Sequence, residues 1–341
     1  MAGPIVGPAD TDPGRVPSRA APAPPPPRGP RLTWRQRLSV ADVTWSPYLY
    51  IAPFFILFGV VGLFPLLYTS YLSLFDRDLL DVESTFVGLA NYATLLGDAQ
   101  FWNALVNTIS IFALSTGPQV VIAVLLAALL NSRLRMPTAW RVGVLLPYVA
   151  SLVALGIIFA NLFGPNYGLV NGMLELLGLD RIDWQANRFA SHIAIAIMVN
   201  WRWTGYNALI VLAAMKAIPR DIHEAAMIDG AGAVRRFVSV TLPLLRPTLI
   251  FVVVTSTIGG MQIFTEPKLF DALPGSNNGG SSNQFQTITL YMYQMAFETQ
   301  HLGYASAIAW VLFLLIIVVA LANFLLTRRL ASTGSIEGGS R

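Results

Sequence analysis

The sequence contains no cysteine and few charged residues. The absence of cysteine among 341 residues excludes disulfides, thiol catalysis and thiolate metal sites. Charged residues make up 12% of the chain, whereas a soluble domain of this length carries about twice that fraction. The formal net charge of +4 is small and gives no support to nucleic-acid binding. These absences favour a membrane protein.

Catalytic motifs are also missing. The three histidines, His192, His223 and His301, lie in separate segments and do not have the H-E-x-x-H spacing of a zinc enzyme. The sequence has no G-x-x-x-x-G-K-S/T phosphate loop and no G-x-S-x-G nucleophile motif. We therefore expect a protein that is not an enzyme, that binds no metal or cofactor of its own and that cannot bind ATP through a phosphate loop.

Long apolar runs are what the sequence does contain. Hydrophobic residues form 55% of the chain and recur in runs near the length that crosses a bilayer, about 20 residues in a helix. An all-α membrane protein with six transmembrane helices is predicted, with spans at residues 48–74, 105–130, 142–162, 190–215, 248–264 and 304–326. Residues 285–298 are predicted to form an amphipathic helix against the outer surface. No internal repeat is visible, which disfavours a secondary transporter.

The distribution of basic residues predicts the orientation. Cytoplasmic loops of membrane proteins are enriched in Lys and Arg. Most of the 22 basic residues lie in segments that would share one side if there are six spans, and the loops between them are acidic. The exceptions outside the spans are Arg77, Arg181, Arg188 and Lys268. Both termini are therefore predicted to be cytoplasmic.

The two ends of the chain differ from the spans in composition. Residues 1–45 are rich in Pro, Ala and Gly and predict a disordered cytoplasmic tail, with a proline-recognition role as the alternative. Residues 46–330 form the predicted six-span domain, and residues 331–341 a flexible C-terminus. No secretory signal is visible, because the first apolar stretch begins only near Tyr48 and is too long for a signal core.

A polar island, residues 216–247, lies between the fourth and fifth predicted spans and is mainly basic. A first helix is expected from about Asp221, which has capping-box spacing to Glu224, to near Gly230, a favoured helix end. A second short helical pattern covers residues 233–240. Helices below about 12–15 residues are marginal alone in water. These two must therefore pack on the protein's own spans or on another protein.

The fourth predicted span carries an unusual polar and aromatic group. Arg202 would lie roughly 21 Å from an inner end at Lys216, given about 1.5 Å of rise per residue. A charge at that depth is costly and functional by default, unless it reaches the outer headgroups. Helical spacing places Asn200, Trp203, Thr204 and Asn207 on one stripe, and Arg202 and Tyr206 on another.

Amides beside an aromatic ring suit a sugar, whose C–H face stacks on the ring while its hydroxyls bind the amides. Interhelical hydrogen bonding is the alternative role for the stripe. Gln262 in the fifth span is a further candidate, while Gly259 and Gly260 suit helix packing. The predicted substrate path comprises Asn200, Arg202, Trp203, Thr204, Tyr206, Asn207 and Gln262.

The polar island resembles the EAA loop of ABC-importer permeases. In that family the loop docks into a cleft of the cytoplasmic ATPase. The matching residues, which the resemblance implies to be the coupling residues, are Glu224, Ala225, Ala226, Asp229, Gly230, Ala231, Phe237 and Pro243, followed by Leu244, Leu245 and Pro247. Purely local roles, a capping glutamate and a turn residue, also explain Glu224 and Asp229.

The resemblance extends from about Trp45 to Arg329 and is strongest to the sugar branch related to the maltose-system membrane subunits. It is carried by the motifs Gly168–Asn171, Ala217–Pro219 and Gly303–Ala307. The segment Gly259–Pro267 resembles permeases for cellobiose and other β-glucosides. Residues 274–280 depart from the family's usual Gly-Gly-Pro pattern.

The resemblance implies a type I ABC importer permease in the plasma membrane of a bacterium. Its implied partners are a second homologous permease, an ATPase dimer that holds ATP and Mg²⁺, an extracytoplasmic sugar-binding protein and membrane lipid. A permease for another solute, such as a glycerol phosphodiester or a short peptide, is one alternative. A non-transporting membrane scaffold or sensor that recruits an ATPase is the other.

Overall fold

The computed structural model describes residues 34–78, 84–132, 134–270 and 279–333. Most of the predicted tail, the last residues of the predicted C-terminus and most of the segment 274–280 lie outside the described residues. The chain divides into two units, Met1–Leu63 and Phe64–Arg341, which we describe separately.

The first unit consists of helix α1 (Trp34–Leu57) and the π-helix η1 (Phe58–Leu63). Residues 34–45, which the sequence assigns to the tail, are thus helical. Pro65 follows η1 and has no N–H to donate to the carbonyl four residues earlier, which accounts for a change of helical register there. The apolar stretch Trp45–Leu72 is long enough to cross a membrane, and no residue of its most apolar 18-residue window is buried within the chain.

The second unit is a helical bundle with one small hairpin, in which Phe75 pairs with Phe86 and Asp76 with Thr85 in antiparallel register. Its elements in chain order are α2 (Phe64–Leu72), β1 (Phe75–Asp76), β2 (Thr85–Phe86), α3 (Ala90–Gly97), α4 (Ala99–Asn131), α5 (Pro137–Val149), α6 (Leu152–Leu162), α7 (Leu169–Leu176), α8 (Arg188–Ala217), α9 (Arg220–Ile228), α10 (Ala233–Arg236), the π-helix η2 (Phe237–Thr241), α11 (Leu242–Leu244), α12 (Arg246–Met261), α13 (Thr265–Phe270), α14 (Ile288–Tyr293), the π-helix η3 (Gln294–Glu298) and α15 (Leu302–Thr333).

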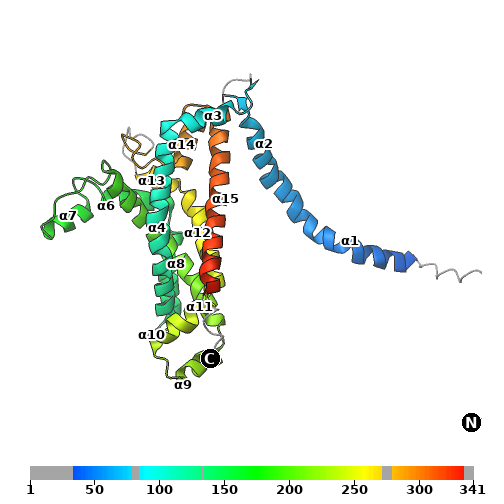
Figure 1. Ribbon diagram of the computed structural model, residues 1–341, viewed down its shortest axis with the longest axis vertical. Helices are drawn as coiled ribbons and strands as arrows, with labels where there is room; N and C mark the ends of the chain where they lie inside the picture. Colours follow the sequence, from blue (N-terminus) through cyan, green and yellow to red (C-terminus); the bar gives the residue numbers. More distant parts are fainter. Residues whose placement is uncertain (1–33, 79–83, 133, 271–278, 334–341) are drawn as a thin grey trace, which may run out of the picture. The chain divides into compact units, whose positions relative to one another are not determined.

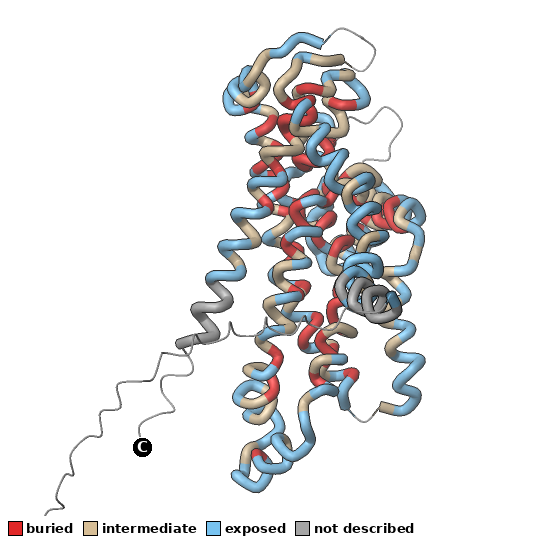
Figure 2. Tube along the Cα trace, turned by 90° about the vertical axis from the view of Figure 1, so that its right-hand side faces the viewer, coloured by how far each residue is buried: buried red, intermediate tan, exposed pale blue. Residues whose placement is uncertain are grey.

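Helices α4 and α8 form the centre of this bundle and pack along each other, with α12 beside α4 and α15 packed against α12 (Figure 1). Fully buried alanines lie on both central helices, including Ala123 and Ala127 on α4 and Ala194 and Ala208 on α8. Small side chains let helix backbones approach closely, which is the usual packing mode in membrane bundles. Figure 2 shows the buried residues gathered where the helices face one another.

Three helices in the described residues are long and apolar enough to cross a membrane: Trp45–Leu72, Ala99–Asn131 and Leu302–Leu325. Two bent pairs raise the count to five if each pair is one span. Helix α8 spans 30 residues, but His192, Asn200, Arg202 and other polar residues reduce its mean hydropathy. The six-span topology therefore stays a prediction, as does the cytoplasmic placement of the termini.

Two expectations need correction. The third predicted span is not one continuous helix, because α5 and α6 meet at an angle of 86°; Pro147 lies near the end of α5 and cannot donate a helical hydrogen bond. The first half of the helix expected on the outer surface at residues 285–298 is instead buried in the core, while Phe297 near its end is exposed. Ile288 and Leu290 in α14 are almost fully buried, because both sides of this segment meet α4 and α15.

Candidate functional site: a polar cavity and the loop below it

The polar island, residues 216–247, ends its first helix in a Schellman motif. Gly230 has φ +75°, the left-handed conformation that glycine adopts at little cost. The Ala231 N–H donates to the Ala226 carbonyl at 3.0 Å, and the Gly230 N–H to the Met227 carbonyl at 3.0 Å. This pattern of two hydrogen bonds satisfies carbonyls that a helix end leaves free. The Asp-Gly-Ala sequence therefore ends α9 and separates it from α10.

The predicted capping box is not formed. The residue that caps α9 is Pro219, whose side chain has no oxygen, and no side chain accepts a hydrogen bond from the first turn. Asp221 lies inside the first turn, where its negative charge interacts favourably with the positive end of the helix dipole. Glu224 is exposed, so its carboxylate is available to a partner rather than held in a local cap.

The remaining predicted coupling residues are distributed between surface and interior. Ala225 and Asp229 are exposed, and Ala226 is buried. Phe237 is half-buried and packs against a cluster of buried hydrophobic residues from α4, α8 and α12. Pro243 occupies the first turn of α11. The loop also exposes large apolar side chains: Met227 at 51%, Ile228 at 87%, Val234 at 78% and Val238 at 53%.

A cavity of about 470 Å³ lies between α4, α5, α8, α12 and α13. It brings together five of the predicted path residues, from two spans: Arg202, Trp203, Tyr206, Asn207 and Gln262. Other lining residues are Thr116, Gln119, Tyr148, Leu152, Val199, Thr255, Ser256, Gly259, Gly260, Ile263, Phe264, Thr265 and Glu266.

An ion pair closes one side of this cavity. Arg202 Nη1 donates to Glu266 Oε1 at 2.9 Å, and the two side chains are 16% and 6% exposed. The guanidinium also lies 5.1 Å from the centre of the Trp203 ring, within the range of a cation–π interaction. Arg202 is therefore held inside the protein by a counter-ion, in contrast to the alternative that it reaches the outer headgroups.

Three aromatic rings form a second wall. Tyr148 and Tyr206 stack with ring centres 4.8 Å apart and planes 17° apart, while Trp203 packs edge-on against both at 5.2 Å and 6.0 Å. Tyr148 comes from α5 and the other two rings from α8. The tilt of α5 against α8 therefore decides whether this wall exists.

Amide and hydroxyl groups complete the lining. Asn207 Nδ2 donates to Gln119 Oε1 at 3.1 Å and to Ser256 Oγ at 3.0 Å, which links α8 to α4 and α12. The interhelical role considered for Asn207 is therefore present, at a position that also lines the cavity. Gln119, Tyr148 and Glu266 also line this cavity, and the sequence analysis did not select them as path residues. Each is a polar residue within or just after an apolar run, which was the available signal.

Asn200 and Thr204 lie elsewhere. They line a different cavity of about 640 Å³, which is largely apolar and is bounded by α4, α5 and α8. Asn200 Oδ1 is buried and has no hydrogen-bond partner among the described residues. The predicted stripe thus splits between two cavities, because the pair 200 and 204 is centred about 60° around the helix from the pair 203 and 207.

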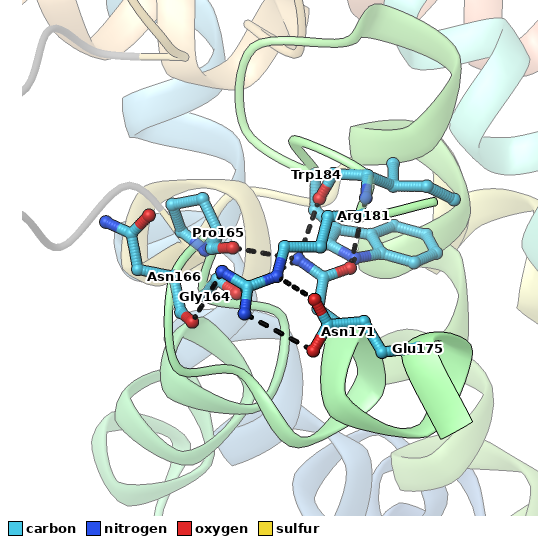
Figure 3. Close-up of polar contacts among 8 residues, drawn as sticks. Gly164, Pro165, Asn166, Asn171, Glu175, Arg181 and Trp184 are labelled. Atoms are coloured by element: carbon cyan, nitrogen blue, oxygen red, sulfur yellow. Dashed lines mark hydrogen bonds and ion pairs between the residues drawn. The ribbon is translucent and has the colours of Figure 1, made fainter. Parts of the chain in front are cut away.

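In the segment between α6 and α8, the buried Asn171 of α7 forms hydrogen bonds through both ends of its side-chain amide (Figure 3). Its Nδ2 donates to the carbonyls of Pro165 at 3.1 Å and Ile182 at 2.9 Å, while its Oδ1 accepts the Trp184 indole N–H at 2.9 Å. Nearby, Arg181 and Glu175 form an exposed ion pair. Asn171 is the last residue of the Gly168–Asn171 motif.

The bundle has the fold of a known import permease. It superposes on a chain of a bacterial ABC transporter involved in the import of the acidic polysaccharide alginate, with a TM-score of 0.71 and 22% identity over 86% of this chain and 99% of that chain. At that identity the likeness shows the fold alone, a helical bundle like that of the alginate importer chain.

The family follows from the sequence itself. Residues 96–332 match the family of binding-protein-dependent transport system inner membrane components, and the chain belongs to this family. It is 36% identical to the lactose transport system permease protein LacF of Rhizobium radiobacter, over 82% of this chain and 93% of that protein. It is also similar to the arabinooligosaccharides permease protein AraP of Bacillus subtilis, at 34% over 86% and 90%.

A third relative is the trehalose/maltose permease protein MalF of Thermococcus litoralis, 31% identical over 79% of this chain and 89% of the relative. The family resemblance stated from the EAA loop is confirmed. The chain is a multi-pass membrane permease subunit, a transport component rather than an enzyme.

Proposed function

We propose that this chain is the permease subunit of an ATP-driven importer that moves a carbohydrate across the plasma membrane of a bacterium. The observation that carries the proposal is the cavity, where the stacked Tyr148 and Tyr206 rings and Trp203 lie beside the amides of Asn207 and Gln262. Rings cover the apolar face of a sugar, and a few placed polar groups bind its hydroxyls. The relatives named for lactose, arabinooligosaccharides and trehalose/maltose support the same class of solute.

The proposed path is formed with a second, homologous permease. This chain contributes Arg202, Trp203, Tyr206, Asn207 and Gln262 from the cavity. Asn200 and Thr204 belong to the path only if their own cavity opens toward it. An extracytoplasmic sugar-binding protein delivers the solute; a solved relative of the fold is described in complex with an alginate pentasaccharide-bound periplasmic protein. The β-glucoside assignment stays a prediction.

The polar island, residues 216–247, is the proposed coupling loop, the surface that docks an ATPase dimer, which holds ATP and Mg²⁺. Two short helices that meet at Gly230 expose Met227, Ile228 and Val234. A partner protein that covers these apolar side chains would remove them from water, which stabilises the complex. Nucleotide shifts the permease between states only if it favours one of them, and this loop transmits that preference. Docking to a cytoplasmic ATPase requires that the loop lie on the cytoplasmic side of the membrane, and we propose that both termini lie on that side too.

Uptake and labelling test the proposal together. In cells that express the complete transporter, labelled disaccharides are expected to enter, whereas glycerol phosphodiesters and short peptides are not. Cysteines placed at Trp203 or Asn207 are expected to react with water-soluble reagents, whereas one at Leu314 on the exposed outer side of α15 is the lipid-facing control. A dry cavity with no uptake would instead support a scaffold.

The docking role needs its own test. A cysteine at the exposed Ala225 is expected to crosslink to an ATP-hydrolysing subunit, and Glu224→Lys is expected to abolish uptake without loss of membrane insertion. Crosslinks that never reach an ATPase, together with unchanged uptake in the Glu224 variant, would contradict the role of the loop.

A further inference from the structure

The cavity between α8, α12 and α13 contains a matched pair of opposite charges. Among its described lining residues, Arg202 is the basic side chain and Glu266 the acidic one. They come from different elements, lie 2.9 Å apart and are largely shielded from water. Because water screens charges weakly at such a depth, removal of either one would leave a strong field in the cavity.

The geometry of this pair leaves binding capacity unused. A guanidinium has five N–H donors in a planar fork, and a saturated bridge to a carboxylate uses two of them side by side. Here a single Nη1–Oε1 contact is made, and the buried Arg202 Nε has no hydrogen-bond partner. The pair therefore differs from a bidentate salt bridge. The two charges cancel, while N–H donors of Arg202 and an oxygen of Glu266 remain beside the aromatic wall.

We propose that Glu266 is a specificity-determining residue, which neutralises Arg202 so that the cavity accepts uncharged saccharides and rejects anionic ones. This rests on the proposed function. A neutral sugar offers hydroxyls, each both donor and acceptor, and these match a guanidinium and a carboxylate at once. An anionic sugar, such as one ending in a uronic acid, meets the Glu266 carboxylate and gains no net attraction from Arg202.

The absence of native cysteine allows the charge of the cavity to be measured directly. Gly259 lines the cavity, and a side chain built there would meet no atom within 4 Å, so Gly259→Cys is a suitable reporter. Its reaction rates with an anionic sulfonatoethyl and a cationic trimethylammonioethyl methanethiosulfonate are compared in the assembled transporter. The same rate ratio at Tyr167→Cys, a fully exposed loop position, provides the reference.

The two single variants are expected to change the ratio in opposite directions. Relative to the reference, the anionic-to-cationic ratio should be close to one with both charges present. Glu266→Gln should raise it about tenfold and Arg202→Gln should lower it about tenfold, and the double variant should return it toward one. If one of the single variants fails to assemble, the rate ratio of the other single variant still tests the proposal. A ratio that neither substitution moves would overturn the proposal.

Competition for uptake tests the solute itself. Uptake of labelled cellobiose by the wild-type transporter is challenged with unlabelled neutral disaccharides or with cellobiouronic acid. The neutral sugars should compete at least tenfold better than the acid, and Glu266→Gln should narrow this difference. Equal competition by the acid in the wild type would contradict the proposal. Failure of every disaccharide to enter would instead contradict the proposed function, while the reagent ratio would still report the cavity charge.

Discussion

Asn171 Oδ1 accepts the indole N–H of Trp184 at 2.9 Å, and this bond joins the start of a loop to its end. The same amide donates through Nδ2 to the carbonyls of Gly164, Pro165 and Ile182, so one buried side chain satisfies groups before and after α7. The Asn residue suits this position because its short amide carries donors and an acceptor together.

Asn171→Asp should therefore destabilise this loop. The substitution replaces two donors with a charged oxygen that faces main-chain carbonyls, and loss of a buried hydrogen-bonded group costs roughly 1–3 kcal/mol. Thermal unfolding in detergent and limited proteolysis between residues 164 and 187 are the measurements. Asn166→Asp is the control, because Asn166 contributes its main-chain carbonyl to Arg181. Equal protease resistance of both variants would contradict this role of Asn171.

Gly205→Ala should disrupt the packing of α5 on α8. A Cβ at Gly205 would lie 1.9 Å from the Val144 carbonyl oxygen, and a backbone atom cannot move aside as a flexible side chain does. Overpacking of this kind costs about 1–3 kcal/mol, and it should also displace Tyr148 from the aromatic wall. Uptake and thermal stability are both expected to fall. Gly143→Ala, on α5 with nothing within 4 Å, is the matched control and should keep both near wild type.

Gly230→Pro should abolish uptake while the protein still inserts into the membrane. Proline cannot adopt φ +75°, and it removes the N–H that bonds Met227. Gly230→Ala should be milder, since an alanine in the left-handed region costs about 1 kcal/mol. Labelled-sugar uptake and the amount of membrane-inserted protein are the readouts. Gly232→Ala is the control because its position is open and its φ is −65°. Wild-type uptake by Gly230→Pro would show that this turn is dispensable.

Asp98→Asn should weaken the protein at neutral pH and flatten its response to acid. Burial by itself would raise the pKa of Asp98, but hydrogen bonds from Tyr291, Tyr304 and the Gln100 amide hold it below its ordinary value of 3.8. A carboxyl whose folded pKa is depressed stabilises the fold above its unfolded pKa, and this contribution disappears as the pH falls through the folded pKa.

The expected loss for Asp98→Asn at pH 7 is about 1 kcal/mol, discounted because the carboxylate is partly exposed. Melting temperatures at pH 7 and pH 3 measure it, and the difference between variant and wild type should shrink at the lower pH. Asp180→Asn, at an exposed loop position, should change neither value. A difference that grows on acidification would contradict the assignment.

The sequence predicted local features well where the cause is local. The stop at Gly230 follows from a glycine in a left-handed turn, a requirement that neighbouring residues alone impose. The end of α8 near Lys216 likewise follows from Pro219, because the residue before a proline disfavours helix. The capping box failed for an equally local reason, since the helix begins one residue before Asp221 and leaves it inside the first turn.

Features that depend on partners far along the chain were not predictable. The predicted stripe on α8 grouped Asn200 and Thr204 with residues that line a different cavity. Periodicity gives the order of residues around a helix but does not give the rotation of the helix against its neighbours. Glu266 is 64 residues from Arg202, and no spacing rule connects the two. The bend between α5 and α6 brings Tyr148 to the cavity, and it was hidden inside a continuous apolar run.

Composition and local pattern thus determined by themselves that this chain is a helical membrane protein with an exposed polar loop that stops a helix at Gly230, since apolar run length and turn chemistry act within a few residues. Tertiary structure alone decided which face of α8 lines the cavity and which acid neutralises its arginine. Those outcomes depend on how helices rotate and bend as they bury one another, and packing of distant segments sets both.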